Sequence, residues 1–121
     1  MATADEEILV IAQIETAEAV NNLDEILSVN GIDVIFVGPA DLAASIGLLG
    51  KPTHPKTLEM INRVLEIGKK HKIPVGIYSL GFEYNAKHVE DGFQFIALGS
   101  DMAFIIRGAR DYLKEVERFA P

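Results

Sequence analysis

The sequence predicts an α/β protein built on a parallel sheet. Short runs of aliphatic and β-branched residues alternate with segments of helical periodicity, and four such units follow one another within 121 residues. The first run is nearly continuous in its apolar character, which is typical of a parallel strand covered on both faces. Successive parallel strands need right-handed crossovers, so the predicted unit is (βα)4.

The first strand-helix unit occupies the amino-terminal quarter of the chain. Ile8–Ile14 is predicted to be a strand, interrupted near its end by the polar Gln13. Thr16 is predicted to cap the following helix, and Asn30-Gly31 is a typical stop signal. The apolar positions of this helix recur at helical spacing: Val20, Leu23, Ile26 and Leu27.

The second unit contains a short strand and a short helix. Val34–Val37 is rich in β-branched residues, and Gly38-Pro39 ends it. We expect a short helix over Asp41–Ile46 and then a loop over residues 47–52, which is rich in Gly and Pro.

The second unit continues with a longer helix that begins near Pro55, a residue suited to the first turn of a helix. That helix is expected to end at His71-Lys72, where cations are favourable to the helix dipole. Pro74–Tyr78 follows as a strand, and Phe82–Asp91 as a weaker helix that ends at Gly92.

The last unit is a strand over Phe93–Leu98 and a long helix. Gly99-Ser100-Asp101 lies at the strand's exit, and we expect Ser100 or Asp101 to cap the helix rather than to serve a site. Arg107 and Arg110 are expected to be solvated charges. One face of the helix carries Ile105, Ala109, Tyr112, Leu113 and Val116.

Composition excludes several classes of protein. The 49% hydrophobic content is too high for a disordered chain, and the net charge of −7 argues against a nucleic-acid or membrane-surface partner. Cysteine is absent, so a metal must be held by oxygen or imidazole. The first residues are acidic, and no apolar run reaches the ~18 residues of a membrane span. We expect a soluble, cytoplasmic protein.

Two carboxylates stand at the exits of neighbouring strands. Glu15 follows the first strand, and Asp41 follows the second across the Gly-Pro turn. Ligands of α/β folds bind at such exits. The simpler interpretation is a glutamate in the first turn of a helix and an aspartate N-cap.

The three histidines lie in a loop before a helix, at a helix end and on the weak helix, at positions 54, 71 and 88. We expect structural roles for them. His54 is the strongest candidate for a role in the site, because its loop follows the strand of Asp41. Four units can form a flavodoxin-like open sheet or half of an eightfold barrel, which needs ~250 residues.

Four blocks, in order and spacing, are similar to the HpcH/HpaI aldolase family, and within it to the metal-dependent pyruvate aldolases rather than the citrate lyase β subunits. The likeness covers about residues 8 to 115. The blocks are Gln13-Ile14-Glu15-Thr16, Ala19-Val20-Asn21-Asn22, Asp33 with Ile35–Leu42, and Ala97–Asp101.

The resemblance implies a TIM-type (β/α)8 barrel of which residues 1–121 form a single domain, the carboxyl-terminal (βα)4 half. It implies that Glu15 and Asp41 bind a divalent cation, Mg²⁺, Mn²⁺ or Co²⁺, and that the metal stabilises the enolate formed when a 4-hydroxy-2-oxo acid is cleaved to pyruvate and an aldehyde. Ala40 and Asp41 would hold the substrate carboxylate, and Gln13 would orient the site. Tyr78 stands where the family usually has a pocket leucine.

The family's catalytic Arg and His have no match in this chain, so no catalytic residue is assigned. The resemblance therefore implies a lyase by family whose activity as a separate chain is in question. The alternatives are a non-catalytic module that binds metal and keto acid or serves assembly, and a truncated product of a longer gene. A half-barrel exposes sheet edges, and we expect a homo-oligomer formed through them or through exchange of the last helix.

Overall fold

A computed structural model describes residues 4–79 and 81–119. These residues form a four-stranded sheet in the order β1-β2-β3-β4, and every neighbouring pair is parallel. Strands adjacent in sequence are thus adjacent in the sheet, which confirms the predicted parallel α/β architecture. The strands are β1 (Ile11–Ile14), β2 (Val34–Val37), β3 (Val75–Tyr78) and β4 (Phe95–Ala97).

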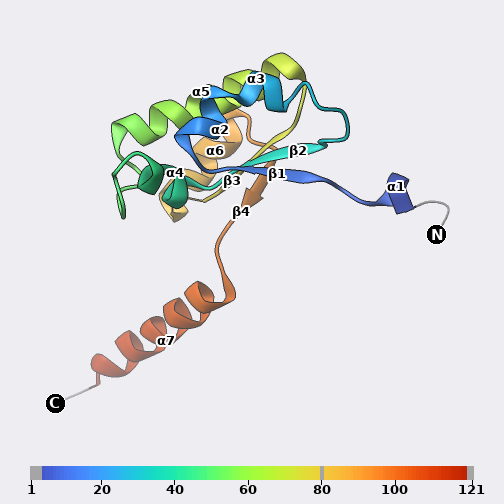
Figure 1. The fold of residues 1–121 in the computed structure, drawn as a ribbon. Helices are drawn as coiled ribbons and strands as arrows, with labels where there is room; N and C mark the ends of the chain where they lie inside the picture. Colours follow the sequence, from blue (N-terminus) through green and yellow to red (C-terminus); the bar gives the residue numbers. More distant parts are fainter. Residues whose placement is uncertain (1–3, 80, 120–121) are drawn as a thin grey trace.

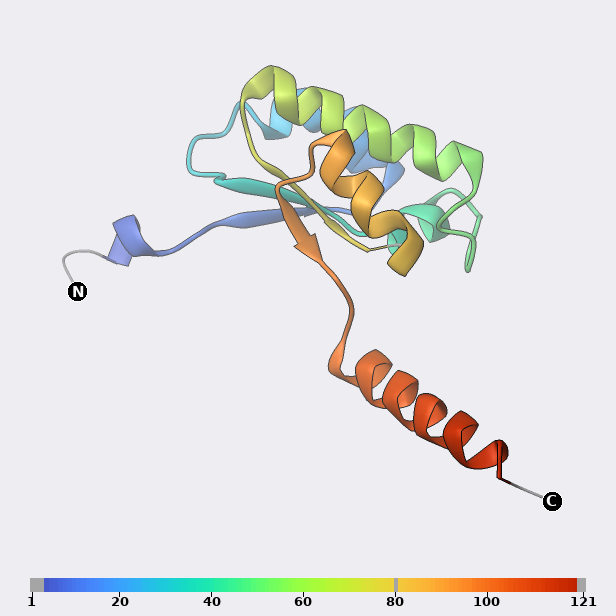
Figure 2. The ribbon, with the colours of Figure 1, turned by 180° about the vertical axis from the view of Figure 1, so that it is seen from behind.

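The crossover helices lie on one side of this sheet (Figures 1 and 2). They are α2 (Ala17–Asn21), α3 (Leu23–Ile26), α5 (Pro55–His71) and α6 (Asn85–Asp91), the last preceded by the 3₁₀ turn η1 (Phe82–Tyr84). A short α4 (Pro39–Ser45) follows β2 directly. The remaining helices are α1 (Ala4–Glu7) and α7 (Asp101–Glu117).

The core lies between the sheet and these helices. Alternate strand residues point toward the helices, and burying them supplies most of the driving force for folding. Leu23 and Leu65 approach them from α3 and α5. The buried strand residues on this face are Ile14, Ile35, Val37, Val75 and Ile77.

The other face of the sheet is uncovered in the described part of the chain. Phe36 and Phe95 point to this side, with ring centroids 5.5 Å apart, and Phe95 is 44% exposed. The expectation that the first strand is covered on both faces is therefore wrong for this chain. A flavodoxin-like sheet is also contradicted, because that fold has helices on both faces and a different strand order.

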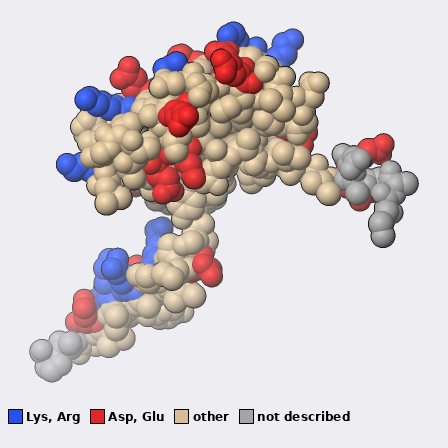
Figure 3. Space-filling view, viewed as in Figure 1, with Lys and Arg blue, Asp and Glu red and all other residues tan. Residues whose placement is uncertain are grey.

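Helix α7 projects away from the sheet on an extended segment (Figure 1). Its side chains are exposed, including the predicted apolar face. Ser100 caps the helix as predicted, accepting a hydrogen bond from the Ala103 N–H at 3.3 Å. Arg107 is more than a solvated charge, because its guanidinium lies 5.4 Å from the ring centre of Phe82. Acidic and basic side chains are interspersed on the face shown in Figure 3.

Several predicted strands and helices are longer than the observed ones. The first strand begins at Ile11 rather than Ile8, and Ile8 is 64% exposed because β2 extends no further to pair with it. The first helix is divided at Asn22 into α2 and α3. The last strand is confined to Phe95–Ala97, although Phe93 is buried in the core.

Other boundaries agree closely with the sequence pattern. Strand β2 and the end of α5 at His71 are as predicted. Lys72 closes α5 in a left-handed conformation with φ of 59°, and Gly92 closes α6 with φ of 102°. Within the described residues, no helix is both long and apolar enough to cross a membrane.

Candidate functional site

The exits of β1 and β2 lie side by side. Register pairs Gln13 with Phe36 and Ile14 with Val37. The Gly38 N–H donates to the Ile14 carbonyl at 3.3 Å, so the parallel pairing continues one step beyond the strands. This places Glu15 beside Gly38, at the carboxyl ends of the two strands.

Gln13 and Glu15 form a hydrogen-bonded pair at the carboxyl end of β1. The Gln13 amide Nε2 donates to Glu15 Oε2 at 2.6 Å. Side chains two residues apart on a strand point to the same face, so this contact follows from strand geometry. The Gln13 amide therefore holds one oxygen of the Glu15 carboxylate.

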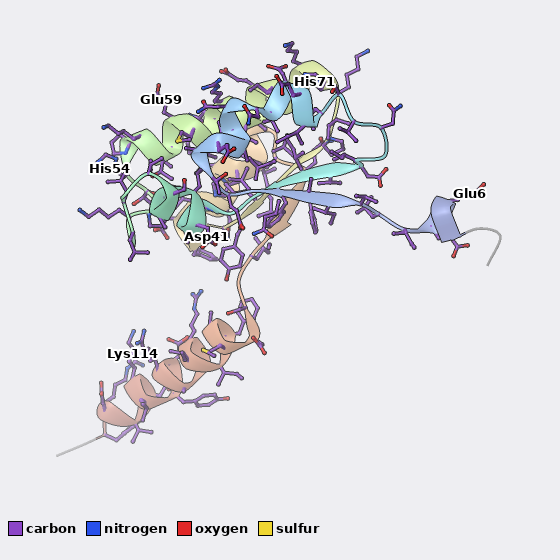
Figure 4. All side chains as sticks on the ribbon, viewed as in Figure 1. Glu6, Asp41, His54, Glu59, His71 and Lys114 are labelled. Atoms are coloured by element: carbon purple, nitrogen blue, oxygen red, sulfur yellow. The ribbon has the colours of Figure 1, made fainter. Side chains whose placement is uncertain are left out.

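Asp41 lies in the first turn of α4 rather than before it. The N-cap is Gly38, and Pro39 occupies the first helical position. The interpretation of Asp41 as an N-cap is therefore wrong, because the Gly-Pro turn starts the helix two residues earlier. The Asp41 side chain is exposed, and Figure 4 shows it on the side of the molecule from which α7 projects, away from Glu59 and His71 on α5.

A hollow of about 260 Å³ connects most of the predicted site residues. It brings together Gln13, Ala40, Asp41 and Tyr78, while Glu15 adjoins it through Gln13 and Gly38. Tyr78 is 41% exposed at the end of β3 and forms one wall. The complete lining is Gln13, Phe36, Gly38, Pro39, Ala40, Asp41 and Tyr78.

Ser45 has a structural role that the sequence did not reveal. Its hydroxyl accepts from the Ala17 N–H at 3.0 Å and donates to the Leu42 carbonyl at 2.7 Å. The Ala17 N–H is in the first turn of α2 and has no acceptor within that helix. Ser45 thus joins the helices that follow Glu15 and Gly38. No local pattern signals a contact across 28 residues.

The histidines lie outside the hollow. His54 caps α5, because its Nδ1 accepts a hydrogen bond from the Lys56 N–H at 3.2 Å. His71 contacts Asp24 at 2.6 Å. The Lys70 ammonium, followed by His71, lowers the pKa of the exposed Asp24 carboxyl. These contacts are structural.

His88 is a buried residue of α6, and its ring lies among aromatic side chains. Its ring stacks 6.1 Å from Tyr84 and meets the edge of Phe93 at 5.4 Å. Burial lowers the pKa of His88, an effect that the nearby Asp91 partly offsets. The expected structural role agrees with this environment.

The site offers hard oxygen donors for a cation, but few of them. In residues 4–79 and 81–119, no three His, Asp or Glu side chains gather to hold a metal ion. Neither Glu15 nor Asp41 forms an ion pair with a described basic side chain. Two carboxylates at adjoining strand exits, without an ion pair to a described basic side chain, suit Mg²⁺ or Mn²⁺. These cations keep several water or substrate ligands.

Residues 2–108 match the model of the HpcH/HpaI aldolase/citrate lyase family. The chain is 38% identical over 114 residues to a hydroxypyruvate/pyruvate aldolase of Paraburkholderia phytofirmans, covering 94% of this chain and 44% of the relative. It is 41% identical to a 4-hydroxy-2-oxo-heptane-1,7-dioate aldolase of Salmonella paratyphi B, covering 88% and 40%. The chain thus spans less than half the length of these relatives.

Solved structures give the same assignment. An HpcH/HpaI aldolase/citrate lyase family protein from Burkholderia cenocepacia superposes with a TM-score of 0.91 at 37% identity, over 96% of this chain and 45% of that one. An HpcH/HpaI aldolase from Desulfitobacterium hafniense gives 0.88 at 29%, over 97% and 45%. The four-stranded unit matches about half of these TIM-barrel-type aldolases. The chain therefore belongs to the HpcH/HpaI aldolase/citrate lyase family, whose named members here are aldolases.

Proposed function

We propose that this chain carries the metal- and carboxylate-binding half of an aldolase-type lyase that cleaves a 4-hydroxy-2-oxo acid to pyruvate and an aldehyde. The observation that supports this most strongly is the hollow at the exits of β1 and β2, which contains Asp41 and adjoins Glu15. Membership of an aldolase family gives the reaction class.

Glu15 and Asp41 would hold the divalent cation, and Gln13 would keep Glu15 oriented through its 2.6 Å hydrogen bond. Bound there, Mg²⁺, Mn²⁺ or Co²⁺ would supply Lewis-acid stabilisation of the negative charge that develops on the 2-oxo acid. The N–H groups of Ala40 and Asp41 are in the first turn of α4, where helices leave N–H groups without an internal acceptor. They are the proposed donors to the substrate carboxylate.

Cleavage breaks the bond between C3 and C4 of the substrate. The 4-hydroxyl loses its proton and becomes the aldehyde oxygen, while C3 gains a proton and becomes the methyl group of pyruvate. A base near the 4-hydroxyl is needed. The three histidines of this chain serve other contacts, so we assign that base to residues outside it.

Pyruvate release tests the proposal. The protein is incubated with a 4-hydroxy-2-oxo acid and Mg²⁺ or Mn²⁺, and pyruvate is measured for wild type, Glu15→Ala and Asp41→Ala. Glu66→Ala removes an exposed carboxylate of α5 and is the matched control. Because the base lies outside this chain, we expect slow release that needs the metal, is lost in both site variants and persists in the control.

A second candidate is a non-catalytic module that binds metal and keto acid or serves assembly. The absence of a histidine at the described hollow favours it. Metal-dependent pyruvate binding without turnover supports this candidate over the lyase. Pyruvate release that is unaffected by both site variants contradicts the two together.

A further inference from the structure

We infer that Gly38 is a positioning residue for the proposed metal site. Its lack of a side chain leaves room for the Glu15 carboxylate and the Gln13 amide at the rim of the hollow. This inference rests on the proposed function, because it concerns the geometry of the same two side chains.

The backbone of Gly38 does not explain why glycine occurs there. Its φ of −100° and ψ of 90° are in the extended region, which residues with a side chain also adopt. The glycines at Gly31, Gly47 and Gly92 differ in this respect, because their φ values of 97°, 76° and 102° are positive. A requirement for glycine at position 38 must therefore come from space.

The space around Gly38 is occupied by the two functional side chains. A Cβ atom at Gly38 would lie 3.1 Å from Glu15 Oε2, 3.2 Å from Gln13 Nε2 and 3.3 Å from Glu15 Cβ. All three distances are shorter than ordinary van der Waals contact with carbon. A methyl group would force these atoms to shift.

Gln13 and Glu15 cannot shift independently. Their 2.6 Å hydrogen bond links the two side chains, so a shift of one amide or carboxylate atom away from the new Cβ also moves its partner or changes the bond between them. Gly38 itself is buried, with its N–H bonded to Ile14, which limits relief by backbone movement. The predicted result of a side chain at position 38 is a displaced Glu15 carboxylate.

A change in helix capping is the competing explanation for any effect that a substitution at position 38 has on metal binding. Gly38 is the N-cap of α4 and offers no side-chain cap. Alanine is a poorer N-cap than glycine, whereas serine is a better one. Gly38→Ala and Gly38→Ser both introduce the Cβ, but only serine also improves capping, so the pair separates steric displacement from loss of the cap.

The test measures Mn²⁺ affinity of the full chain by the loss of the free Mn²⁺ signal in electron paramagnetic resonance. We expect Gly38→Ala and Gly38→Ser to weaken binding by roughly 10- to 100-fold, as for other residues that orient metal ligands. The control is Gly108→Ala on α7, where a Cβ would meet no atom within 4 Å. Circular dichroism melting confirms that each variant folds.

Each outcome has a distinct meaning. Wild-type affinity in both Gly38 variants overturns the role of Gly38 and leaves the metal site in place. If Gly38→Ala weakens Mn²⁺ binding and Gly38→Ser does not, the effect comes from helix capping. This result also overturns the positioning role of Gly38. Absence of Mn²⁺ binding by the wild-type protein contradicts the proposed metal site itself, and the role of Gly38 with it.

Discussion

Gly76 on β3 has no room for a side chain, because it lies against the aromatic pair of the uncovered face. A Cβ there would be 2.6 Å from Phe36 Cδ2 and 2.7 Å from the Phe95 carbonyl oxygen. The second contact is with backbone, which cannot rotate away. Phe36 also lines the hollow, so a side chain at position 76 would displace one wall of the site.

Gly76→Ala is therefore expected to destabilise the protein by about 1–3 kcal/mol, the usual cost of overpacking. Urea denaturation measures the change in the free energy of unfolding. Gly108→Ala is the control, because alanine in an uncrowded helix is favourable by about 0.5–1 kcal/mol. Equal stability of Gly76→Ala and wild type would show that the sheet relaxes around the methyl group.

Tyr78 determines the size and polarity of the hollow on the β3 side. We expect Tyr78→Leu to shift preference in aldol addition of pyruvate toward larger, more apolar aldehydes, by about 10-fold in relative kcat/KM. Tyr78→Phe removes only the hydroxyl and separates polarity from size. An unchanged preference in Tyr78→Leu would exclude Tyr78 from the aldehyde side of the pocket.

Among the elements, α6 contains a buried histidine that makes the stability of the protein depend on pH. The pKa of His88 is lowered by burial, and an unfolded histidine has a pKa of about 6.5. Below that pH the unfolded chain takes up a proton that the folded chain does not. Stability is therefore full above about pH 6.5 and falls as the pH decreases toward the folded pKa.

The melting temperature of wild type should accordingly fall more between pH 7.5 and 5.5 than that of His88→Leu. Melting followed by circular dichroism checks this difference. His54 and His71 are common to both proteins, so their contributions cancel in the comparison. Parallel pH dependence of the two proteins would show that His88 does not contribute.

Elements bounded by strong local signals could be predicted from the sequence. Strand β2 lies between Asp33 and the Gly-Pro turn, and α5 lies between Pro55 and Lys72, so both boundaries follow from residue chemistry. Strand β1 could not be delimited, because its length depends on where β2 offers a partner. The predicted start of α4 at Asp41 failed because Pro39 begins the helix.

The candidate site was predictable to a similar degree. The positions of Glu15 and Asp41 at neighbouring strand exits follow from the apolar runs that precede them. The contacts of Gly38 and Ser45 could not be predicted, since they join residues more than twenty positions apart in sequence. Such contacts depend on the register between β1 and β2.

At the scale of the whole molecule, two apolar surfaces have no cover in the described chain. One is the sheet face with Phe36 and Phe95, and the other is the apolar side of α7. We propose that a second copy of this chain covers them, through the sheet edges or by exchange of α7. The aligned part of this chain spans less than half the length of the relatives.

Sedimentation velocity tests this proposal. Wild type should sediment as a dimer or larger, and a double substitution of Ile105→Glu and Leu113→Glu on α7 should shift it toward monomer. Lys114→Ala, a charged position on the same helix, should leave association unchanged. A monodisperse wild-type monomer would contradict self-association.

The measurement that bears most directly on the central claim is titration of the protein with Mn²⁺. The account predicts one site per chain, weakened at least roughly 10-fold by Glu15→Ala and by Asp41→Ala, and unaffected by Glu66→Ala. Wild-type Mn²⁺ affinity in either site variant would contradict the claim that these two carboxylates form the metal-binding half of an aldolase site.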